Sequence, residues 1–330
     1  MKRLVVILIL CMVQGSLLGC NLSGSTPPTD VPPTPPPTWT PMTCVGPAIT
    51  LGEISENSND VITSMQPLAD YLAGRLAGFG YKCGKVKVVL TIDDMIEAIN
   101  NGEVDLYMDS IFPAALVSNS TGAQPVLRRW RNCDPEYYSV LFTTPDSGIT
   151  SIEDLPGHMM AMDRSYSTSG FALPAAYLLD RGLNLVIKKS WDEPVAADEV
   201  GIFFSLDDKN TLALVREGKV SAGVTDDWYF GNWEVDSPGT LVKLAETASV
   251  LRQVVLVRSS LESNLREAIK KQLSEAHLNP DGVFVMEQAV DTCKFDQPPD
   301  GIEAVIGQMQ DIWDKIKDIP GWQEAYKQGH

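Results

Sequence analysis

Three hydroxyl side chains stand beside a glycine in what we term the hydroxyl cluster, Ser167, Thr168, Ser169 and Gly170. The cluster follows a short apolar run and precedes a segment of helical periodicity that ends at Gly182. A strand-to-helix turn of this composition presents O–H donors and free backbone N–H groups at the positive end of a helix. We therefore predict that these four residues bind a tetrahedral oxyanion, with the Gly170 amide as an additional donor.

A structural role is the alternative for the same residues. Serine is a common helix N-cap, so Ser167 or Ser169 could serve only to start the helix. Pro174 follows shortly after the cluster, and a proline inside a helix removes a hydrogen bond. Regular helix is therefore expected to begin near Leu173, with the hydroxyl cluster forming an anion-binding turn just before it.

The residues around the hydroxyl cluster follow a recognisable order. An Asp-Leu-Pro-Gly turn at 154–157 precedes the strand, and Leu-Leu-x-x-Gly at 178–182 closes the helix. With Pro174, this order resembles the phosphate, phosphite and phosphonate solute-binding proteins of ABC transporters. Residues 51–76 resemble the first strand and helix of that family, and residues 210–230 resemble its later helix and strand. The resemblance extends over residues 47–300.

The alternation of strand-like and helical segments indicates an α/β protein with mostly parallel sheets flanked by helices. We expect strands at 49–54, 86–90, 106–108, 139–142, 159–162, 222–224 and 253–257. We expect helices at 61–76, 92–100, 172–179, 211–217, 261–276 and 302–317.

The resemblance implies a two-lobed, periplasmic-binding-protein-like fold with two hinge crossings. Two apolar strands near 138–142 and 254–257 fall where the chain could cross between lobes. We therefore expect lobe I to comprise residues 44–143 plus 256–330, and lobe II residues 144–255. The cleft between the lobes should hold the ligand, because ligands bind beyond the carboxyl ends of parallel strands. The hydroxyl cluster, the loop at 53–59 and the loop at Asp109 should meet there.

Five residues are candidates for the opposite wall of the cleft. Tyr107 and Asp109 stand in DLYMDSIFPAAL, where the family usually shows Gly-Pro-x-x-Tyr, so Tyr107 as an ordinary core aromatic is the alternative. Asp226 and Asp227 precede an aromatic pair and could bind an ammonium group or a protonated oxyanion. One of these two aspartates should be a helix N-cap. Asn57 is a candidate for either ligand contact or capping.

The N-terminal segment has the pattern of an export signal. Lys2 and Arg3 precede an apolar run that is too short to span a bilayer. Leu-Leu-Gly-Cys at 17–20 resembles a bacterial lipobox, which implies a signal peptide at 1–19 and lipid on Cys20; an ordinary secretory signal is the alternative. The proline-rich residues 20–43 should form an extended spacer between a membrane and the folded part.

The chain has a net charge of −17, or −19 once Lys2 and Arg3 leave with the signal. A protein this acidic, with no basic stripe, is not expected to bind nucleic acid. An anion site in such a protein should depend on local hydroxyl and N–H donors. We therefore do not expect positive side chains to provide the contacts that bind the anion.

Four cysteines remain in the folded part: Cys44, Cys83, Cys133 and Cys293. An even number in an exported protein is compatible with two disulfides, and three pairings exist. Cys44 and Cys83 each precede an apolar strand-like run, so in a parallel sheet they could lie side by side, which leaves Cys133 with Cys293. A metal site is the alternative, although no Cys-x-x-Cys spacing occurs.

Few residues could support enzymatic chemistry. The three histidines, His158, His277 and His330, fall in no plausible catalytic arrangement, and the chain lacks the P-loop and dinucleotide-binding motifs. We expect a monomeric, lipid-anchored binding protein without cofactor that delivers a small oxyanion to an ABC permease. The alternatives are a sensory binding module, a protein that binds another small solute in the same cleft, and a hydrolase that uses carboxylates.

Overall fold

The computed structural model describes residues 44–329. The predicted signal peptide, Cys20 and the proline-rich spacer lie outside these residues. Within them, no helix is both long enough and apolar enough to cross a membrane. The described chain forms two six-stranded sheets and one two-stranded pair.

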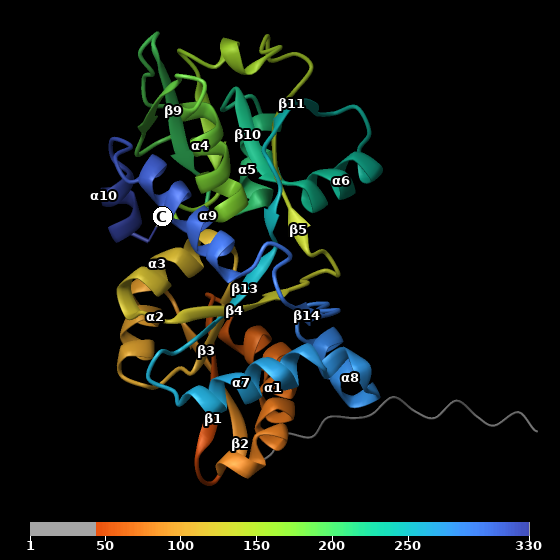
Figure 1. The fold of residues 1–330 in the computed structure, drawn as a ribbon. Helices are drawn as coiled ribbons and strands as arrows, with labels where there is room; N and C mark the ends of the chain where they lie inside the picture. The colour runs from red at the N-terminus through yellow and green to blue at the C-terminus, as the bar shows by residue number, and fades with distance from the viewer. Residues whose placement is uncertain (1–43, 330) are drawn as a thin grey trace, which may run out of the picture. The chain divides into compact units, whose positions relative to one another are not determined.

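The first sheet has the strand order β14-β4-β13-β3-β1-β2 (Figure 1). Its strands are β1 (Ala48–Ile54), β2 (Cys83–Val89), β3 (Leu106–Asp109), β4 (Gln124–Arg129), β13 (Gln253–Val257) and β14 (Phe295–Asp296). β2, β1 and β3 are parallel, whereas β13 runs antiparallel to both β3 and β4. The carboxyl ends of β1, β3 and β4 therefore meet at one edge of the sheet.

The second sheet has the strand order β11-β6-β10-β7-β9-β8. Its strands are β6 (Ser139–Thr143), β7 (Met159–Met162), β8 (Asn184–Ile187), β9 (Glu199–Phe204), β10 (Ala222–Asp226) and β11 (Val242–Glu246). β8, β9, β7 and β10 are parallel, and β6 runs antiparallel to its two neighbours. The α/β fold with two sheets is confirmed, and both sheets are mixed: most strand pairs of the second sheet are parallel, whereas most of those of the first are antiparallel.

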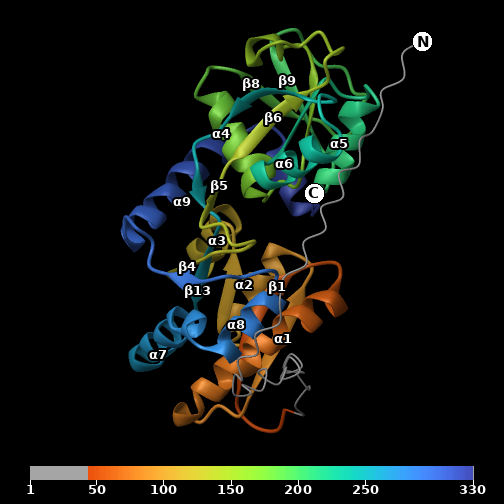
Figure 2. The same cartoon turned by 90° about the vertical axis from the view of Figure 1, so that its right-hand side faces the viewer.

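The chain crosses between the sheets at a short antiparallel pair, β5 (Glu136–Tyr137) with β12 (Val250–Leu251). In Figure 2, β5 lies between β6 of the second sheet and β4 of the first. The lobe limits predicted from sequence placed 139–143 with lobe I and 253–255 with lobe II. In the structure, β6 pairs with β10 of the second sheet, and β13 pairs with β3 of the first sheet. Residues 139–143 therefore go with lobe II, and residues 253–255 with lobe I. We propose moving the limits to β5 and β12, since apolarity shows that a strand is buried but not which sheet it joins.

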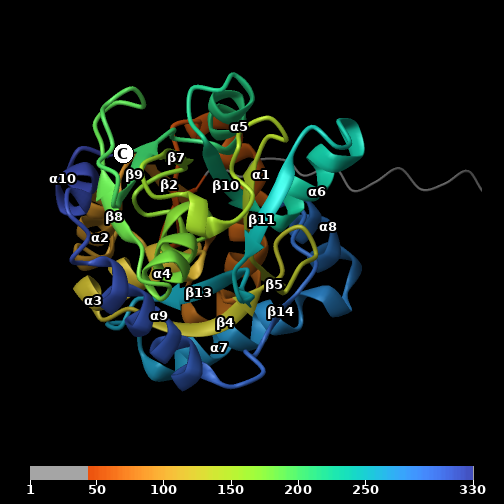
Figure 3. The ribbon, with the colours of Figure 1, turned by 90° about the horizontal axis from the view of Figure 1, so that it is seen from above.

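Ten helices occur in the described residues. They are α1 (Ser58–Arg75), α2 (Ile92–Asn100), α3 (Ile111–Thr121), α4 (Leu173–Leu179), α5 (Asp208–Arg216), α6 (Asp227–Asp236), α7 (Ser263–Ser274), α8 (Pro280–Gln288), α9 (Ile302–Ile316) and α10 (Trp322–Lys327). α9 packs against both α3 and α4, as Figures 1 and 3 show. The C-terminal segment, which we expected to belong to lobe I, therefore contacts helices of both lobes.

Local sequence explains several of these elements. Thr91 caps α2 by accepting a hydrogen bond from the Asp94 N–H, and the acidic residues of the first turn suit the helix dipole. The residues of α2 that face the core recur at helical spacing: Ile92, Met95, Ala98 and Ile99. Gly84 allows β2 to approach α1, because a Cβ there would lie 2.1 Å from the Ala69 backbone.

Candidate functional site

A cavity of about 500 Å³ lies between the two sheets and the hinge. Its walls come from the carboxyl ends of strands in both sheets, as expected for open α/β sheets. Asp109 and Arg129 end β3 and β4, whereas Asp163 follows β7 and Asp226 ends β10. The loop after β1 also contributes, so the predicted convergence of these loops is found.

Ser167 both caps a helix and lines the cavity. It precedes a single π-helical turn, Thr168–Ala172, and its Oγ accepts a hydrogen bond from the Gly170 N–H at 3.1 Å. Pro174 lies in the first turn of α4, which begins at Leu173 as predicted. Capping and cavity contact, which the sequence presented as alternatives, coexist at this residue.

The four residues of the hydroxyl cluster do not all face the cavity. Ser167 and Ser169 line it, whereas Gly170 is buried and its N–H is bonded to Ser167. A Cβ at Gly170 would lie 2.4 Å from the Asp163 Cβ, so this glycine is required by close packing. The N–H groups of Thr168 and Ser169 belong to the first helical turn, where no intrahelical acceptor exists. The turn therefore offers hydroxyl and amide donors, but not the Gly170 amide.

Thr168 joins the two lobes. Its side chain is 1% exposed, and its Oγ1 accepts a hydrogen bond from the Phe112 N–H at 2.9 Å. The same hydroxyl donates to the Ser110 Oγ at 2.9 Å. Thr168 therefore ties the π-helical turn to the start of α3 and does not line the cavity. No pattern in the sequence could show this contact, because its partners lie more than fifty residues away in the chain.

Of the residues expected on the opposite wall, Asp109 lines the cavity and Tyr107 does not. Tyr107 is 1% exposed within β3, and its hydroxyl donates to Asp109 Oδ2 at 2.6 Å. The Ser110 N–H donates to the other carboxylate oxygen at 2.6 Å. Burial raises the pKa of Asp109, although these two hydrogen bonds oppose the shift. Tyr107 is thus a core residue that orients Asp109.

Asp226 is the aspartate that caps α6. Its Oδ1 accepts from the Tyr229 N–H at 2.7 Å, and its Oδ2 pairs with Arg252 at 3.0 Å. Asp226 also lines the cavity, whereas Asp227 accepts from the Tyr138 N–H at 3.3 Å and does not line it.

Asn57 does not line the cavity, although Ser55 before it and Val61 after it do. It is exposed before α1, and its side chain makes no capping hydrogen bond. Neither role considered for Asn57 is found in the described structure.

Four arginines line the cavity: Arg129, Arg131, Arg164 and Arg252. Positive side chains therefore line the site, although from the sequence we expected hydroxyl and N–H donors, and not positive side chains, to bind the anion. Net charge was misleading because it describes the whole surface, whereas these side chains are gathered by the fold at one place. Their positions carried a signal, since Arg129 directly ends an apolar strand and Arg252 directly precedes one.

Two carboxylates of the cavity have strongly raised pKa values. Burial raises the pKa of Glu53 to about 7, and the charge of Arg129 opposes the shift. Burial also raises the pKa of Asp208 to about 7, although Asp208 accepts a hydrogen bond from the Thr225 hydroxyl at 2.6 Å. Carboxyl groups that are half protonated near neutral pH can accept from, or donate to, an oxyanion.

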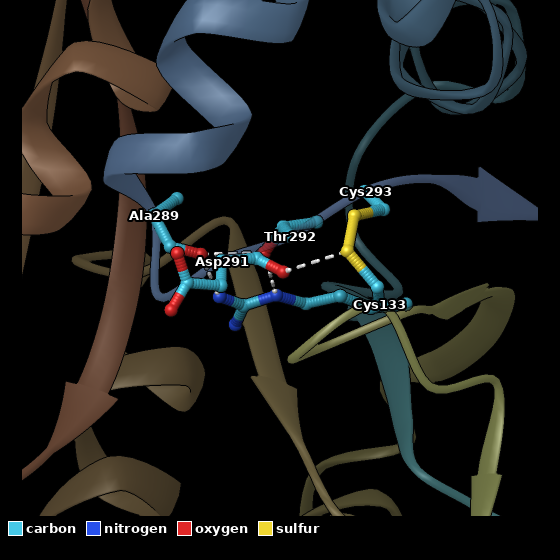
Figure 4. The surroundings of a disulfide bond; sticks show 6 residues. Cys133, Ala289, Asp291, Thr292 and Cys293 are labelled. Carbon is cyan, nitrogen blue, oxygen red and sulfur yellow. Dashed lines mark hydrogen bonds between the residues drawn. A yellow bond between two sulfur atoms is a disulfide. The ribbon is translucent and has the colours of Figure 1, made fainter. Parts of the chain in front are cut away.

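Figure 4 shows a disulfide, Cys133–Cys293, that joins the chain after β4 to the chain before β14. It joins two turns in which Asn132 and Val290 line the cavity with φ of 55° and 49°. Positive φ is rare for a β-branched residue, so surrounding contacts must hold this backbone. Beside the disulfide, Arg129 donates to Thr292 Oγ1 at 2.9 Å and to the Ala289 carbonyl at 2.8 Å.

The second disulfide, Cys44–Cys83, lies at the amino ends of β1 and β2. The pairing favoured by the sequence is therefore the one formed. No group of three or more potential metal ligands occurs among residues 44–329.

Comparison with known proteins yields one family and several similar folds. A model of the family described as "ABC transporter, phosphonate, periplasmic substrate-binding protein" matches residues 51–298. The phosphate-import protein PhnD of Mycolicibacterium smegmatis is 26% identical over 239 residues, which are 69% of this chain and 71% of the relative.

Two solved structures show the same fold. XAC2383 from Xanthomonas citri, bound to chloride ion, has a TM-score of 0.75 at 23% identity. The superposition covers 81% of this chain and 99% of the XAC2383 chain. PhnD1 from Prochlorococcus marinus, in complex with methylphosphonate, has a TM-score of 0.60 at 16% identity. The superposition covers 82% of this chain and 98% of the PhnD1 chain.

Proposed function

This chain belongs to the family of phosphonate-binding periplasmic substrate-binding proteins of ABC transporters, and from that premise we propose that it captures a phosphorus oxyanion in the inter-lobe cavity. The family binds a small ligand and works with a membrane permease; its members are not enzymes. The observation that carries the proposal is the placement of Ser167 and Ser169 on the cavity wall at the start of a helix. The ligand is a phosphonate, phosphite or phosphate.

In this proposal the oxyanion is bound by the second-lobe wall. The Ser169 hydroxyl and the N–H groups of Thr168 and Ser169 donate to it, and Ser167, whose hydroxyl is hydrogen-bonded to Asp163 and to the Gly170 N–H, holds the turn in shape. Arg252, already paired with Asp226, adds positive charge near the hinge. Thr168 contributes to binding through its backbone N–H, and its side chain contacts the other lobe. Gly170 contributes only by allowing the turn to pack closely.

Carboxylates on the cavity wall favour a protonated phosphorus oxyanion over sulfate. Asp109 and Asp226 line the cavity and can accept a hydrogen bond from a P–OH group. A fully deprotonated anion offers no such donor and is repelled.

Lipid attachment at Cys20 and an extracytoplasmic position complete the proposal, with the protein acting as a monomer that meets its permease on closing. Cys20→Ala should move the protein from the membrane fraction to the soluble exported fraction. Retention at the membrane would contradict lipid anchoring.

A sensory role is the second candidate function. Co-purification with a permease distinguishes a transport role from a sensory role.

The binding proposal is tested with Ser169→Ala by calorimetry and thermal unfolding. We expect at least a tenfold loss of affinity for phosphate or methylphosphonate, since hydrogen bonds to charged groups contribute about 1.5–3 kcal/mol. The ligand-free unfolding free energy should not change, because no capping bond is lost. Ser167→Ala should reduce both affinity and stability, the latter by about 1 kcal/mol.

Ser120→Ala, on the exposed end of α3, is the matched control and should change neither quantity. The proposal is wrong if no phosphorus oxyanion raises the melting temperature, since a ligand at a hundred times its Kd should add about 2.7 kcal/mol.

A further inference from the structure

The first-lobe wall of the cavity contains three polar atoms that lack hydrogen-bond partners among the described residues. They are Glu53 Oε1, Gln253 Oε1 and Arg131 Nε, and each atom is buried. All three side chains line the cavity, and Gln253 is only 6% exposed. An unpaired buried polar group costs about 1–3 kcal/mol, so three of them at one place require an explanation. A bound ligand that supplies their partners is such an explanation.

The three side chains come from three segments of the first sheet, which has the order β4-β13-β3-β1 in this region. Glu53 lies near the end of β1, Arg131 lies two residues beyond β4, and Gln253 opens β13 directly opposite Arg129. The three side chains belong to the first lobe, whereas the hydroxyl cluster belongs to the second lobe and is distant from them in the sequence. A ligand that reaches both walls must therefore carry a second polar group besides its phosphorus oxyanion.

Other charged groups nearby are already engaged. Arg129 and Asp109, which both act electrostatically on Glu53, are bonded within the protein. Arg129 donates to Thr292 and Ala289, and Asp109 accepts from Tyr107 and Ser110. On this wall, Glu53 and Arg131 are therefore the carboxylate and the guanidinium that keep a buried atom without any hydrogen-bond partner among the described residues.

The donors and acceptors on this wall define the chemistry of the second group. Glu53 and Gln253 present acceptor oxygens and need N–H donors, whereas Arg131 presents a donor and needs an anionic acceptor. An alkyl group would leave all three unpaired, and a second anion would be repelled by Glu53. A group that carries an ammonium beside a carboxylate satisfies all three at once.

We propose, on the basis of the phosphorus-oxyanion function above, that the physiological ligand is an amino acid bearing a phosphonate or phosphate group. Glu53 and Gln253 bind its ammonium, Arg131 binds its carboxylate, and the hydroxyl cluster binds its phosphorus oxyanion. A cavity of about 500 Å³ falls in the range of pockets for ligands much larger than phosphate.

The test compares four probes that share a phosphonate group by calorimetry on the exported, folded protein. They are 2-amino-3-phosphonopropionate, 3-phosphonopropionate, 2-aminoethylphosphonate and ethylphosphonate. We expect the first to bind at least tenfold more tightly than either probe that lacks one group, and ethylphosphonate to bind most weakly. If ethylphosphonate binds as tightly as the amino acid, this inference is overturned while the oxyanion function stands. If none of the four binds, the oxyanion function itself fails.

Variants separate the two parts of the amino-acid group. Glu53→Gln and Gln253→Leu should each abolish the affinity gained from the ammonium, and Arg131→Gln the affinity gained from the carboxylate. All three should bind ethylphosphonate as the unmodified protein does, which also shows that they are folded. Glu303→Gln and Arg266→Gln, remote from the cavity, are the controls. Equal losses for all four probes in every variant would overturn the inference.

Discussion

Ser167 and Asp226 each combine helix capping with a position on the cavity wall. Ser167 caps the π-helical turn and Asp226 caps α6, and both line the cavity. Ligand sites at helix N-termini favour this combination, because the capping residue stands where the free N–H groups and the helix dipole point. Capping therefore does not argue against ligand contact at such positions.

At the residue scale, Glu53 should make stability depend on pH. Its pKa of about 7 lies above the ordinary value of 4.5, so the native state binds more protons than the unfolded state between these pH values. The stability contributed by Glu53 therefore falls as pH rises from about 4.5 to about 7. Glu53→Gln removes this dependence and should be more stable than the unmodified protein at pH 8, but not at pH 4.

Urea unfolding of both proteins across this range measures the difference. Glu303→Gln, on the exposed face of α9, should show no such trend. A stability difference that stays constant from pH 4 to pH 8 would contradict the raised pKa. Arg129, Arg131 and Asp109 face Glu53 and must be kept unchanged in the comparison.

At the scale of elements, the helices differ in how clearly the hydrophobic periodicity of the sequence predicts them. α2 was predicted with its observed bounds because its buried residues recur at helical spacing. α3 was missed because residues 111–117 are all buried, which leaves no amphipathic pattern. The start of α6 was expected from its capping aspartate, but its extent was not predicted, since none of its residues is buried. Periodicity detects a helix only when one face is buried and the other is exposed.

The contact between α1 and β2 should depend on Gly84. Gly84→Ala places a Cβ against the Ala69 backbone, which cannot yield as a flexible side chain would. We expect a loss of at least about 2 kcal/mol in the free energy of unfolding. Gly74→Ala, within α1 and with no atom near its Cβ, should instead stabilise by about 0.5–1 kcal/mol. Denaturant unfolding of both variants distinguishes the two effects, and equal changes would contradict them.

The two disulfides should differ in their effect on binding. Their sequence separations of 39 and 160 residues correspond to about 4 and about 5 kcal/mol in the chain-entropy model. Replacing either pair by serine should therefore lower stability. Only loss of Cys133–Cys293 should also weaken ligand affinity, because that bond holds the turns carrying Asn132 and Val290 at the cavity. An unchanged affinity in Cys133→Ser with Cys293→Ser would show that these turns hold their shape unaided.

At the scale of the molecule, the lobes are joined by more than the hinge strands. The Trp322 indole N–H donates to the Ser165 carbonyl at 2.8 Å, and its ring lies 6.3 Å from that of Phe112. Tyr326 of α10 reaches Asp93 of α2, and Lys315 of α9 pairs with Asp180 beyond α4. These C-terminal contacts link residues of both lobes, so opening of the cleft must move or break some of them.

Thr168→Val should shift the equilibrium between closed and open forms. The change removes the hydrogen bonds to Ser110 and Phe112 and leaves the Phe112 N–H without an acceptor, at a cost of about 1–3 kcal/mol. Small-angle scattering should show a larger radius of gyration without ligand, and calorimetry a lower affinity. Thr121→Val removes hydroxyl bonds at the end of α3, to the Val117 carbonyl and from the Ala123 N–H, which lie within one lobe, and it should leave the radius unchanged. An unchanged radius in Thr168→Val would contradict a role in closure.

The sequence alone was sufficient to predict the strands at 159–162 and 253–257, the start of regular helix at Leu173 before Pro174, and the favoured disulfide pairing. These follow from local properties: apolar runs, turn chemistry and the order of neighbouring residues. Only the tertiary structure decided that β6 joins the second sheet, that Thr168 bonds across the lobes, and that arginines meet carboxylates in the cavity. Each of these depends on residues that are distant in the chain and brought together by the pairing of strands, which local pattern does not encode.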